Sequence, residues 1–162
     1  MKTLLALLLL ASADPGAFEI PGVPFVRQES HWCGPASLAS VLAYYGCPDD
    51  QQTIARAVYT DALKGALVTD LENYAVSRGF QTRIGQGTAE DVKACLHQGR
   101  PVIVLVDLGF WILSQPHYLV ITGYGPAGFI AHTGQESGRA FPYEEFERIW
   151  AKKGSVYLLV WR

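Results

Sequence analysis

Helical and strand patterns divide the chain into two halves, and this order constrains the fold more than any other feature. Apolar residues recur mainly at helical spacing between Cys33 and His97, whereas apolar runs of strand length dominate from Val102 to Trp161. A doubly wound parallel sheet would require strands and helices to alternate along the chain. The sequence therefore predicts an α+β fold in which a helical N-terminal half packs on a C-terminal antiparallel sheet.

Glycine and proline mark the expected helix ends. The first helix is expected to begin at Cys33, with Pro35 in its first turn, and to end at Gly46, because proline suits the first helical turn and glycine follows helix ends. Further helices are predicted over residues 51–59, 67–77, 88–97 and 143–150.

Six strands are predicted, over residues 23–26, 80–84, 102–106, 118–124, 129–133 and 155–161. The run 102–106 is apolar throughout, which is typical of a strand buried on both faces. Gly125-Pro126-Ala127-Gly128 provides the turn that would join 118–124 and 129–133 into a hairpin. Pro24 places the strand 23–26 at a sheet edge, because proline cannot donate a backbone hydrogen bond.

The first 13 residues have the organisation of a signal peptide. Lys2 supplies a positive charge, Leu4–Leu10 is apolar, and Ala11-Ser12-Ala13 has the small residues that a signal peptidase reads. Residues 14–22 follow as an extended leader, and residues 23–162 are predicted to form a single domain. We expect an exported protein, periplasmic or secreted. The later chain has no uninterrupted apolar stretch of roughly 20 residues, so no stable membrane insertion is expected after cleavage.

Charge and composition exclude several functional classes. The 13 basic and 15 acidic residues give a net charge of −2, whereas a nucleic-acid-binding domain needs a strongly basic face. Gly85-Gln86-Gly87 lacks the third glycine of a dinucleotide-binding fingerprint. The sequence has no Cys-x-x-Cys or His-x-x-x-His spacing of the kind that binds zinc. We therefore expect no cofactor, no metal and no nucleic-acid partner.

Cys33 lies where a nucleophilic thiol would be built. The segment from Gln28 to Ala36 reads QESHWCGPA and places Cys33 at the start of a predicted helix. Unpaired amides and the helix dipole favour a thiolate there, and a thiolate can attack a carbonyl carbon. Gln28 could offer a side-chain N–H to the developing oxyanion. The alternative is that Cys33 is a small buried apolar residue and Gln28 a surface polar residue.

His117 is the second candidate. It precedes the apolar run Tyr118–Ile121 and would lie at the start of a strand, where its ring can project into a cleft. An imidazole so placed could accept the thiol proton and later donate a proton to the leaving amine. The alternative is a histidine satisfied at a strand end.

Together these residues resemble the papain-like double-glycine (bacteriocin leader) peptidases, and more narrowly their stand-alone, exported branch. The similarity rests on Gln28 five residues before Cys33-Gly34-Pro35-Ala36 and on His117-Tyr118 opening a strand, and it extends over roughly Val23–Trp161. It implies a papain-like cysteine peptidase fold. It also implies that Cys33 is the nucleophile, His117 the general base and acid, and Gln28 the oxyanion donor.

The residue that orients His117 departs from the family pattern. Many members carry an aspartate about sixteen residues after the histidine, and that position here is Thr133. A hydroxyl can accept the imidazole N–H but stabilises an imidazolium less than a carboxylate does. Pairing Gly125 with Gly128 would instead place Glu136 opposite His117, and a one-residue shift would place Gln135 there. Four candidates follow, namely Thr133, Glu136, Gln135 and His132.

The three cysteines leave two arrangements open. In an exported chain, one free thiol and one disulfide would pair Cys47 with Cys95 and leave Cys33 for chemistry. The alternative is that Cys47 and Cys95 are two buried free thiols.

The sequence as a whole predicts an exported cysteine peptidase that cleaves a peptide or protein through a Cys–His acyl-enzyme mechanism. Two other functions remain open, namely acyl (peptidyl) transfer on the same fold and non-catalytic peptide binding. The expected partner is a peptide or protein substrate, with a secretion system as a further candidate. The apolar segment Gly109–Leu113 just before His117 is interpreted as a flap lining the substrate cleft, and the alternative is that it is buried against a neighbouring element. Gly-Gly specificity is not implied, because this chain is expected to act outside the cytoplasm, unlike its transporter-linked relatives.

Overall fold

A computed structural model describes residues 16–162, so the predicted signal peptide and residues 14–15 lie outside the described residues. The helices are α1 (Cys33–Tyr44), α2 (Gln51–Val58), α3 (Val68–Ser77), α4 (Ala89–His97) and α5 (Tyr143–Ala151), with a 3-10 turn at Asp61–Leu63. The strands are β1 (Phe18–Glu19), β2 (Tyr59–Thr60), β3 (Gly65–Ala66), β4 (Gln81–Gln86), β5 (Val102–Asp107), β6 (Pro116–Gly125), β7 (Gly128–His132), β8 (Arg139–Pro142) and β9 (Val156–Trp161). No helix within residues 16–162 is long and apolar enough to cross a bilayer.

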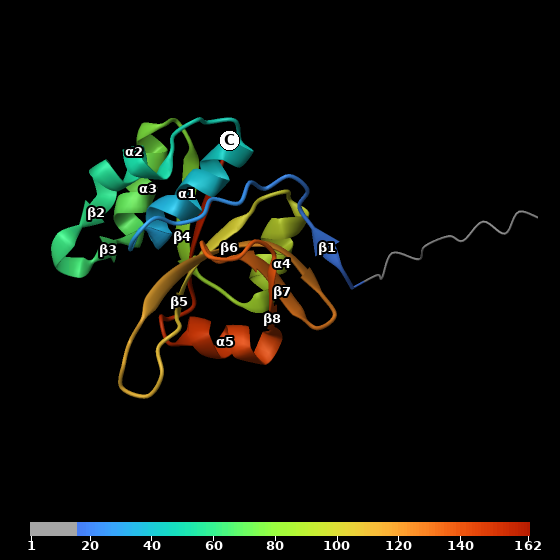
Figure 1. Ribbon diagram of the computed structural model, residues 1–162. Helices are drawn as coiled ribbons and strands as arrows, with labels where there is room; N and C mark the ends of the chain where they lie inside the picture. Colours follow the sequence, from blue (N-terminus) through green and yellow to red (C-terminus); the bar gives the residue numbers. More distant parts are fainter. Residues whose placement is uncertain (1–15) are drawn as a thin grey trace, which may run out of the picture.

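One antiparallel sheet forms the centre of the fold, as predicted. Its strands follow the order β4-β9-β5-β6-β7-β8, and β1 pairs with β6 outside this path. The short strands β2 and β3 pair separately. Helices cover both faces of the sheet, with α1, α2 and α3 on one side and α4 and α5 on the other (Figure 1).

Alternating residues of the central strands divide the core into two clusters. Val102, Val104 and Val106 pack with α4 and α5, whereas Ile103 packs with α1, α2 and α3. This alternation follows from the two-residue period of a strand, and it explains why the run 102–106 is apolar on both faces. β5 therefore contributes side chains to both core clusters, one on each face of the sheet.

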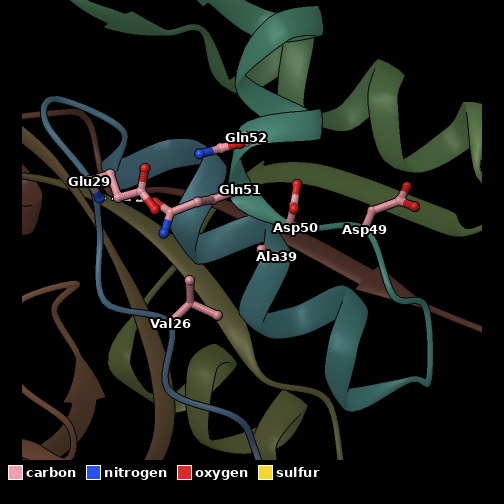
Figure 2. Close-up of a pocket in the computed structure, with 7 residues that line it drawn as sticks. All are labelled: Val26, Glu29, Ala39, Asp49, Asp50, Gln51 and Gln52. Carbon is pink, nitrogen blue, oxygen red and sulfur yellow. Dashed lines mark hydrogen bonds between the residues drawn. The ribbon is translucent and has the colours of Figure 1, made fainter.

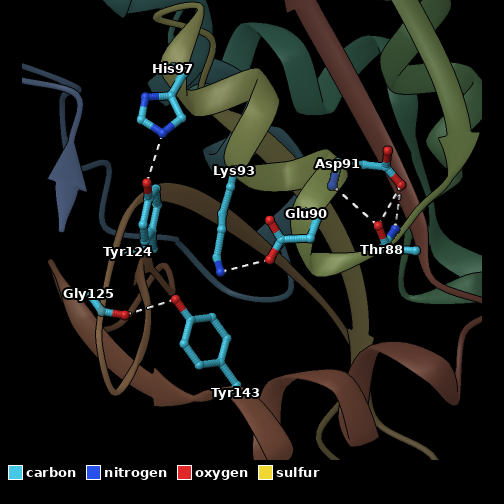
Figure 3. A network of polar contacts seen from close by, with 8 residues as sticks. All are labelled: Thr88, Glu90, Asp91, Lys93, His97, Tyr124, Gly125 and Tyr143. Atoms are coloured by element: carbon cyan, nitrogen blue, oxygen red, sulfur yellow. Dashed lines mark hydrogen bonds and ion pairs between the residues drawn. The ribbon is translucent and has the colours of Figure 1, made fainter. Parts of the chain in front are cut away.

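Local signals at the helix starts agree with the sequence. Asp50 caps α2, because its Oδ1 accepts the backbone N–H of Thr53 at 2.8 Å. Thr88 and Asp91 form a capping box at the start of α4 (Figure 3). Figure 3 also shows how α5 is attached to the β6–β7 hairpin. The hydroxyl of Tyr143, at the start of α5, donates to the Gly125 carbonyl at 2.8 Å.

The predicted edge strand at 23–26 is wrong. These residues are irregular, and the segment is held by side chains instead: His132 Nε2 donates to the Val23 carbonyl at 3.0 Å and Ser40 Oγ donates to the Pro24 carbonyl. Strand pairing occurs upstream, where Phe18 and Glu19 pair with β6. Pro24 has no N–H for a ladder, whereas Phe18 and Glu19 do. Part of the predicted leader is therefore built into the sheet.

The Cys47–Cys95 disulfide is also excluded by the structure. All three cysteines are free, and Cys47 and Cys95 belong to the two different core clusters on opposite faces of the sheet. A disulfide requires Cα atoms within about 7 Å of each other, which a sheet between the residues prevents.

We expect three thiols per chain to react with a thiol reagent in denaturant, and the same number after prior treatment with a reductant. A single reactive thiol before reduction and three afterwards would contradict this arrangement. The Cys47→Ala variant is the matched control and should titrate two thiols under both conditions.

Candidate active site

Cys33 is the first residue of α1, as predicted, and its neighbours explain how the helix start reaches the sheet. Gly34 is buried, and a Cβ atom at this position would lie 3.3 Å from both the Leu71 side chain and the Tyr118 ring. The small residue therefore lets β6 approach the beginning of α1. Because Tyr118 directly follows His117, this contact brings the strand start and the helix start together.

The imidazole of His117 is oriented by a backbone carbonyl. Its Nε2 lies 2.7 Å from the carbonyl oxygen of Thr133. A carbonyl can only accept, so Nε2 carries the proton in this hydrogen bond, and the neutral ring keeps its lone pair on Nδ1. The tautomer with a basic Nδ1 is thus fixed by the fold.

The structure places Thr133 against His117, but the contact is made by its main-chain carbonyl and not by the hydroxyl that the sequence suggested. Its hydroxyl oxygen accepts the backbone N–H groups of Gln135 at 3.2 Å and Glu136 at 2.9 Å, and so closes a turn after β7. The hydroxyl is used within this turn, and the main-chain oxygen of the same residue faces His117.

The other three candidates for orienting His117 form no hydrogen bond with its ring among the described residues. Gly125 does pair with Gly128, but a bulge between Ile121 and Gly123 shifts the register, and β7 ends at His132 before reaching the level of His117. Gln135 and Glu136 lie in the turn. His132 donates to Val23 and accepts the N–H of Gly138 at 3.1 Å, which is a structural role.

Gln28 reaches the same site from the loop before α1. Its Nε2 donates to the Ser30 carbonyl at 3.0 Å, and its Oε1 is buried with no partner in the described part of the chain. The backbone N–H of Gln28 donates to the Gly134 carbonyl at 2.8 Å, next to Thr133. The side-chain amide nitrogen of Gln28 carries two N–H groups, so one of them stays free after the other has donated to Ser30.

The residue that holds this loop was not predicted from the sequence. Gln51, at the start of α2, is buried: its Oε1 accepts the N–H of Glu29 at 3.0 Å and its Nε2 donates to the carbonyl of Arg27 at 2.8 Å. Figure 2 shows Gln51 directed toward Glu29. One side-chain amide therefore clamps the peptides on both sides of Gln28. A glutamine after a helix cap has no distinctive pattern, so only its burial reveals it.

The four predicted site residues line one polar cleft of about 380 Å³. Gln28 and Cys33 contribute from the N-terminal half, and His117 and Thr133 from the sheet. A second pocket, of about 470 Å³, adjoins it at Cys33 and has mainly apolar walls. Among residues 16–162, no hydrogen bond joins the Cys33 sulfur to His117, and no group of three or more metal-binding side chains occurs.

Burial controls the protonation of the pair. Burial raises the pKa of the Cys33 thiol above its ordinary value, although the backbone N–H groups of Tyr118, Gly34 and Cys33 itself act in the opposite direction. Burial lowers the pKa of His117 below its ordinary value, and the Thr133 carbonyl opposes this shift. The helix start therefore favours the Cys33 thiolate, as expected, but the net pKa shift of this thiol is upward. The amides act in the expected direction, but desolvation outweighs them.

The sequence model of the Peptidase_C39 like family matches residues 20–158. The chain belongs to this family. Comparison with curated proteins finds no match.

Solved structures support the same fold. A candidate C39-like peptidase from Bacillus anthracis aligns with a TM-score of 0.74 at 17% identity, covering 90% of this chain and 98% of that one. The peptidase domain of Streptococcus ComA, a bifunctional ABC transporter, aligns with a TM-score of 0.68 at 23% identity, covering 86% and 98%. A double-glycine-motif protease from an AMS/PCAT transporter, solved with its leader peptide, aligns with a TM-score of 0.70 at 21% identity, covering 88% and 92%. The papain-like fold is thus confirmed.

The apolar loop of this C39-like chain is not the flap that the sequence suggested. Phe110, Trp111, Ile112 and Leu113 are each at least 74% exposed, and none of them lines either pocket at Cys33. The β5–β6 loop instead extends away from the body of the protein (Figure 1).

The base of this loop is held by Asp107. The buried carboxylate accepts hydrogen bonds from the Ser114 hydroxyl at 2.6 Å and from the N–H groups of Gln115 at 2.9 Å and Gly109 at 2.8 Å. It also pairs with Lys153 at 3.3 Å. These hydrogen bonds, the one from Ser114 first, lower the pKa of Asp107 well below its ordinary value. The network keeps the loop base, and hence the start of β6 at Pro116, in place.

Proposed function

We propose that the chain is an exported cysteine peptidase that hydrolyses a peptide or protein substrate through a Cys33–His117 acyl-enzyme mechanism. Membership of the Peptidase_C39 like family supports peptidase activity in general. The observation that carries the specific mechanism is the hydrogen bond from His117 Nε2 to the Thr133 carbonyl, because it leaves Nδ1 as the base in a cleft that Cys33 also lines.

The first half of the reaction forms the acyl-enzyme. His117 Nδ1 accepts the thiol proton as the Cys33 sulfur bonds to the substrate carbonyl carbon, whose π electrons move to oxygen. The free N–H of Gln28 donates to this oxyanion. Collapse of the tetrahedral intermediate breaks the C–N bond, and the imidazolium returns its proton to the leaving amine.

The second half regenerates the enzyme. His117 takes a proton from water as the water oxygen attacks the thioester carbon, and the C–S bond then breaks with the proton returned to sulfur. Because the Cys33 pKa is raised and the His117 pKa is lowered, the free pair rests as thiol and neutral imidazole. The proton therefore transfers during the attack and not before it.

The test is hydrolysis of labelled, denatured casein by the full chain, with the acylated residue identified by mass mapping after inhibition with a peptidyl electrophile. We expect new amino termini to appear and the electrophile to attach to Cys33. Absence of cleavage together with the absence of labelling at Cys33 would overturn the proposal.

Gln51→Ala is expected to lower kcat by about tenfold, less than the 10²–10³ typical of losing an oxyanion donor outright. The substitution removes the two hydrogen bonds that hold the peptides flanking Gln28. The affinity for a peptide aldehyde, whose adduct oxygen occupies the oxyanion position, should fall in parallel. The alkylation rate of Cys33 by iodoacetamide, which needs no oxyanion donor, should stay the same.

Gln52→Ala is the matched control for this prediction. Gln52 is the exposed neighbour on the same helical turn, and the structure gives its side chain no hydrogen bond to the loop of Gln28 within the described residues. Equal aldehyde affinity in the Gln51 and Gln52 variants would show that the clamp does not position Gln28.

A further inference from the structure

Cys33 lines two pockets, and the proposed mechanism does not use the larger one. It has a volume of about 470 Å³ and is here called the apolar pocket. Its lining residues are Cys33, Leu63, Lys64, Gly65, Ala66, Leu67, Val68, Thr69, Leu105, Pro116, Tyr118 and Lys153. We propose that the apolar pocket receives a bulky apolar side chain from the acyl half of the substrate, so that preferred cleavage sites do not carry two glycines. This inference rests on the proposed peptidase function.

Two of the four polar side chains that line the apolar pocket, Tyr118 and Lys153, are already used within the protein, and Lys64 and Thr69 are the other two. The Tyr118 hydroxyl donates to the Ala66 carbonyl at 3.0 Å, so this residue presents its ring to the space. Lys153 is bound to Asp107 and to the Ser114 hydroxyl at 3.1 Å. What remains free to contact a ligand is mainly hydrocarbon, and such a surface recognises an apolar group by removing it from water.

Two apolar side chains at the pocket are kept in solvent. Leu63 and Leu67 are 57% and 51% exposed, although both line the space. They lie on either side of β3, which pairs with β2 and packs against α1. Exposed apolar residues around a pocket indicate a binding surface. A substrate side chain would cover them.

The direction of the substrate follows from the chemistry at Cys33. The leaving amine receives its proton from His117, which lines the polar cleft and not the apolar pocket. The chain after the scissile bond therefore departs through the polar cleft. The acyl half stays bonded to the Cys33 sulfur, which borders both spaces, and extends into the apolar pocket.

Two glycines before the scissile bond would leave this volume empty. A solved relative in this fold is described as a double-glycine-motif protease, with its leader peptide bound. Glycine has no side chain with which to bury the walls formed by Leu105, Val68 and the Tyr118 ring. Because apolar burial contributes in proportion to area, leucine or phenylalanine gains binding here that glycine cannot.

The experiment compares internally quenched peptides that differ only in the two residues before the scissile bond, with Gly, Leu or Phe at each. We expect kcat/KM to be at least about tenfold higher for the best Leu or Phe peptide than for the Gly-Gly peptide, as a filled apolar pocket typically provides. A Gly-Gly peptide that is cleaved as well as or better than the others overturns the inference.

Val68→Phe tests the pocket itself, because a phenyl group at the start of α3 would occupy part of the space. We expect the Leu-to-Gly ratio of kcat/KM to fall toward one. Val76→Phe is the matched control, since it places the same substitution on the same helix at a position that is 53% exposed and outside the pocket. It should keep the wild-type ratio, and equal ratios in both variants would contradict the assignment.

Failure of this inference can be separated from failure of the proposed function. Cys33-dependent cleavage of the peptides with no preference between glycine and leucine rejects the apolar-pocket assignment alone. If no peptide is cleaved and the peptidyl electrophile does not label Cys33, the peptidase proposal itself fails. The wild-type peptide series also decides the question if Val68→Phe does not fold.

Discussion

Cys33→Ala is expected to abolish peptide hydrolysis, with a loss of at least about 10³-fold, because the sulfur forms the covalent bond on which both halves of the reaction depend. Cys33 is only partly exposed at the start of α1, and replacing its thiol with a methyl hydrogen leaves the backbone hydrogen bonds of the helix in place. The melting temperature should therefore stay close to that of the wild type. Initial rates on labelled casein and a thermal melt measure the two effects.

Cys47→Ala and Cys95→Ala are the matched controls, since both cysteines are buried in the core and away from the cleft. Each should keep the turnover of the wild type at temperatures below its melting transition. A Cys33→Ala protein that still hydrolyses casein would reject the acyl-enzyme mechanism. If it loses no binding to a peptide ligand and the wild type shows no turnover, the chain is a peptide-binding module.

The helix starts were predictable because they depend on a few neighbouring residues. A proline two residues after Cys33, a cap at Asp50 and the Thr88–Asp91 box are all readable from local sequence, and the structure places helices at each of them. The positions of Cys33 and His117 also follow from local patterns, since one opens a helix and the other lies at a strand start.

The atom of Thr133 that contacts His117 could not be predicted, because it is a main-chain oxygen. Every residue has a carbonyl, so no residue type marks it. Its position depends on one bulge between Ile121 and Gly123, which changes the register of the hairpin by one residue. The turn after β7, closed by the Thr133 hydroxyl, then directs this carbonyl toward the ring.

Long-range packing decided the remaining differences. The helix start at Cys33 does favour a thiolate, but the amount of burial depends on how closely β6 approaches, and burial prevails. The pairing of β1 with β6 likewise joins residues about 100 positions apart in the chain, which local patterns do not encode. The role of Gln51 could not be predicted for the same reason, since its side chain contacts a loop more than 20 residues away in the chain.

His117→Ala is expected to lower kcat by about 10²–10⁴-fold, the usual contribution of a general base. The substitution also changes how the peptidase activity depends on pH. In the wild type His117 must be neutral to accept the thiol proton, and its pKa lies below the ordinary value, so activity should fall only on the acid side of pH 6.5. At alkaline pH, activity falls when Cys33, whose pKa is raised above 9.0, has lost the proton that His117 would pass to the leaving amine.

Without the imidazole, only the thiolate can attack, and its fraction rises about tenfold per pH unit below the Cys33 pKa. The residual activity of His117→Ala should therefore increase steadily from pH 7 to pH 9, whereas the wild type is flat over this range. His97→Ala is the matched control, because His97 contacts Tyr124 on the far layer and lines neither pocket at Cys33. A flat profile in the His117 variant would mean that another group removes the proton, and the orientation imposed by the Thr133 carbonyl would then have no part in catalysis.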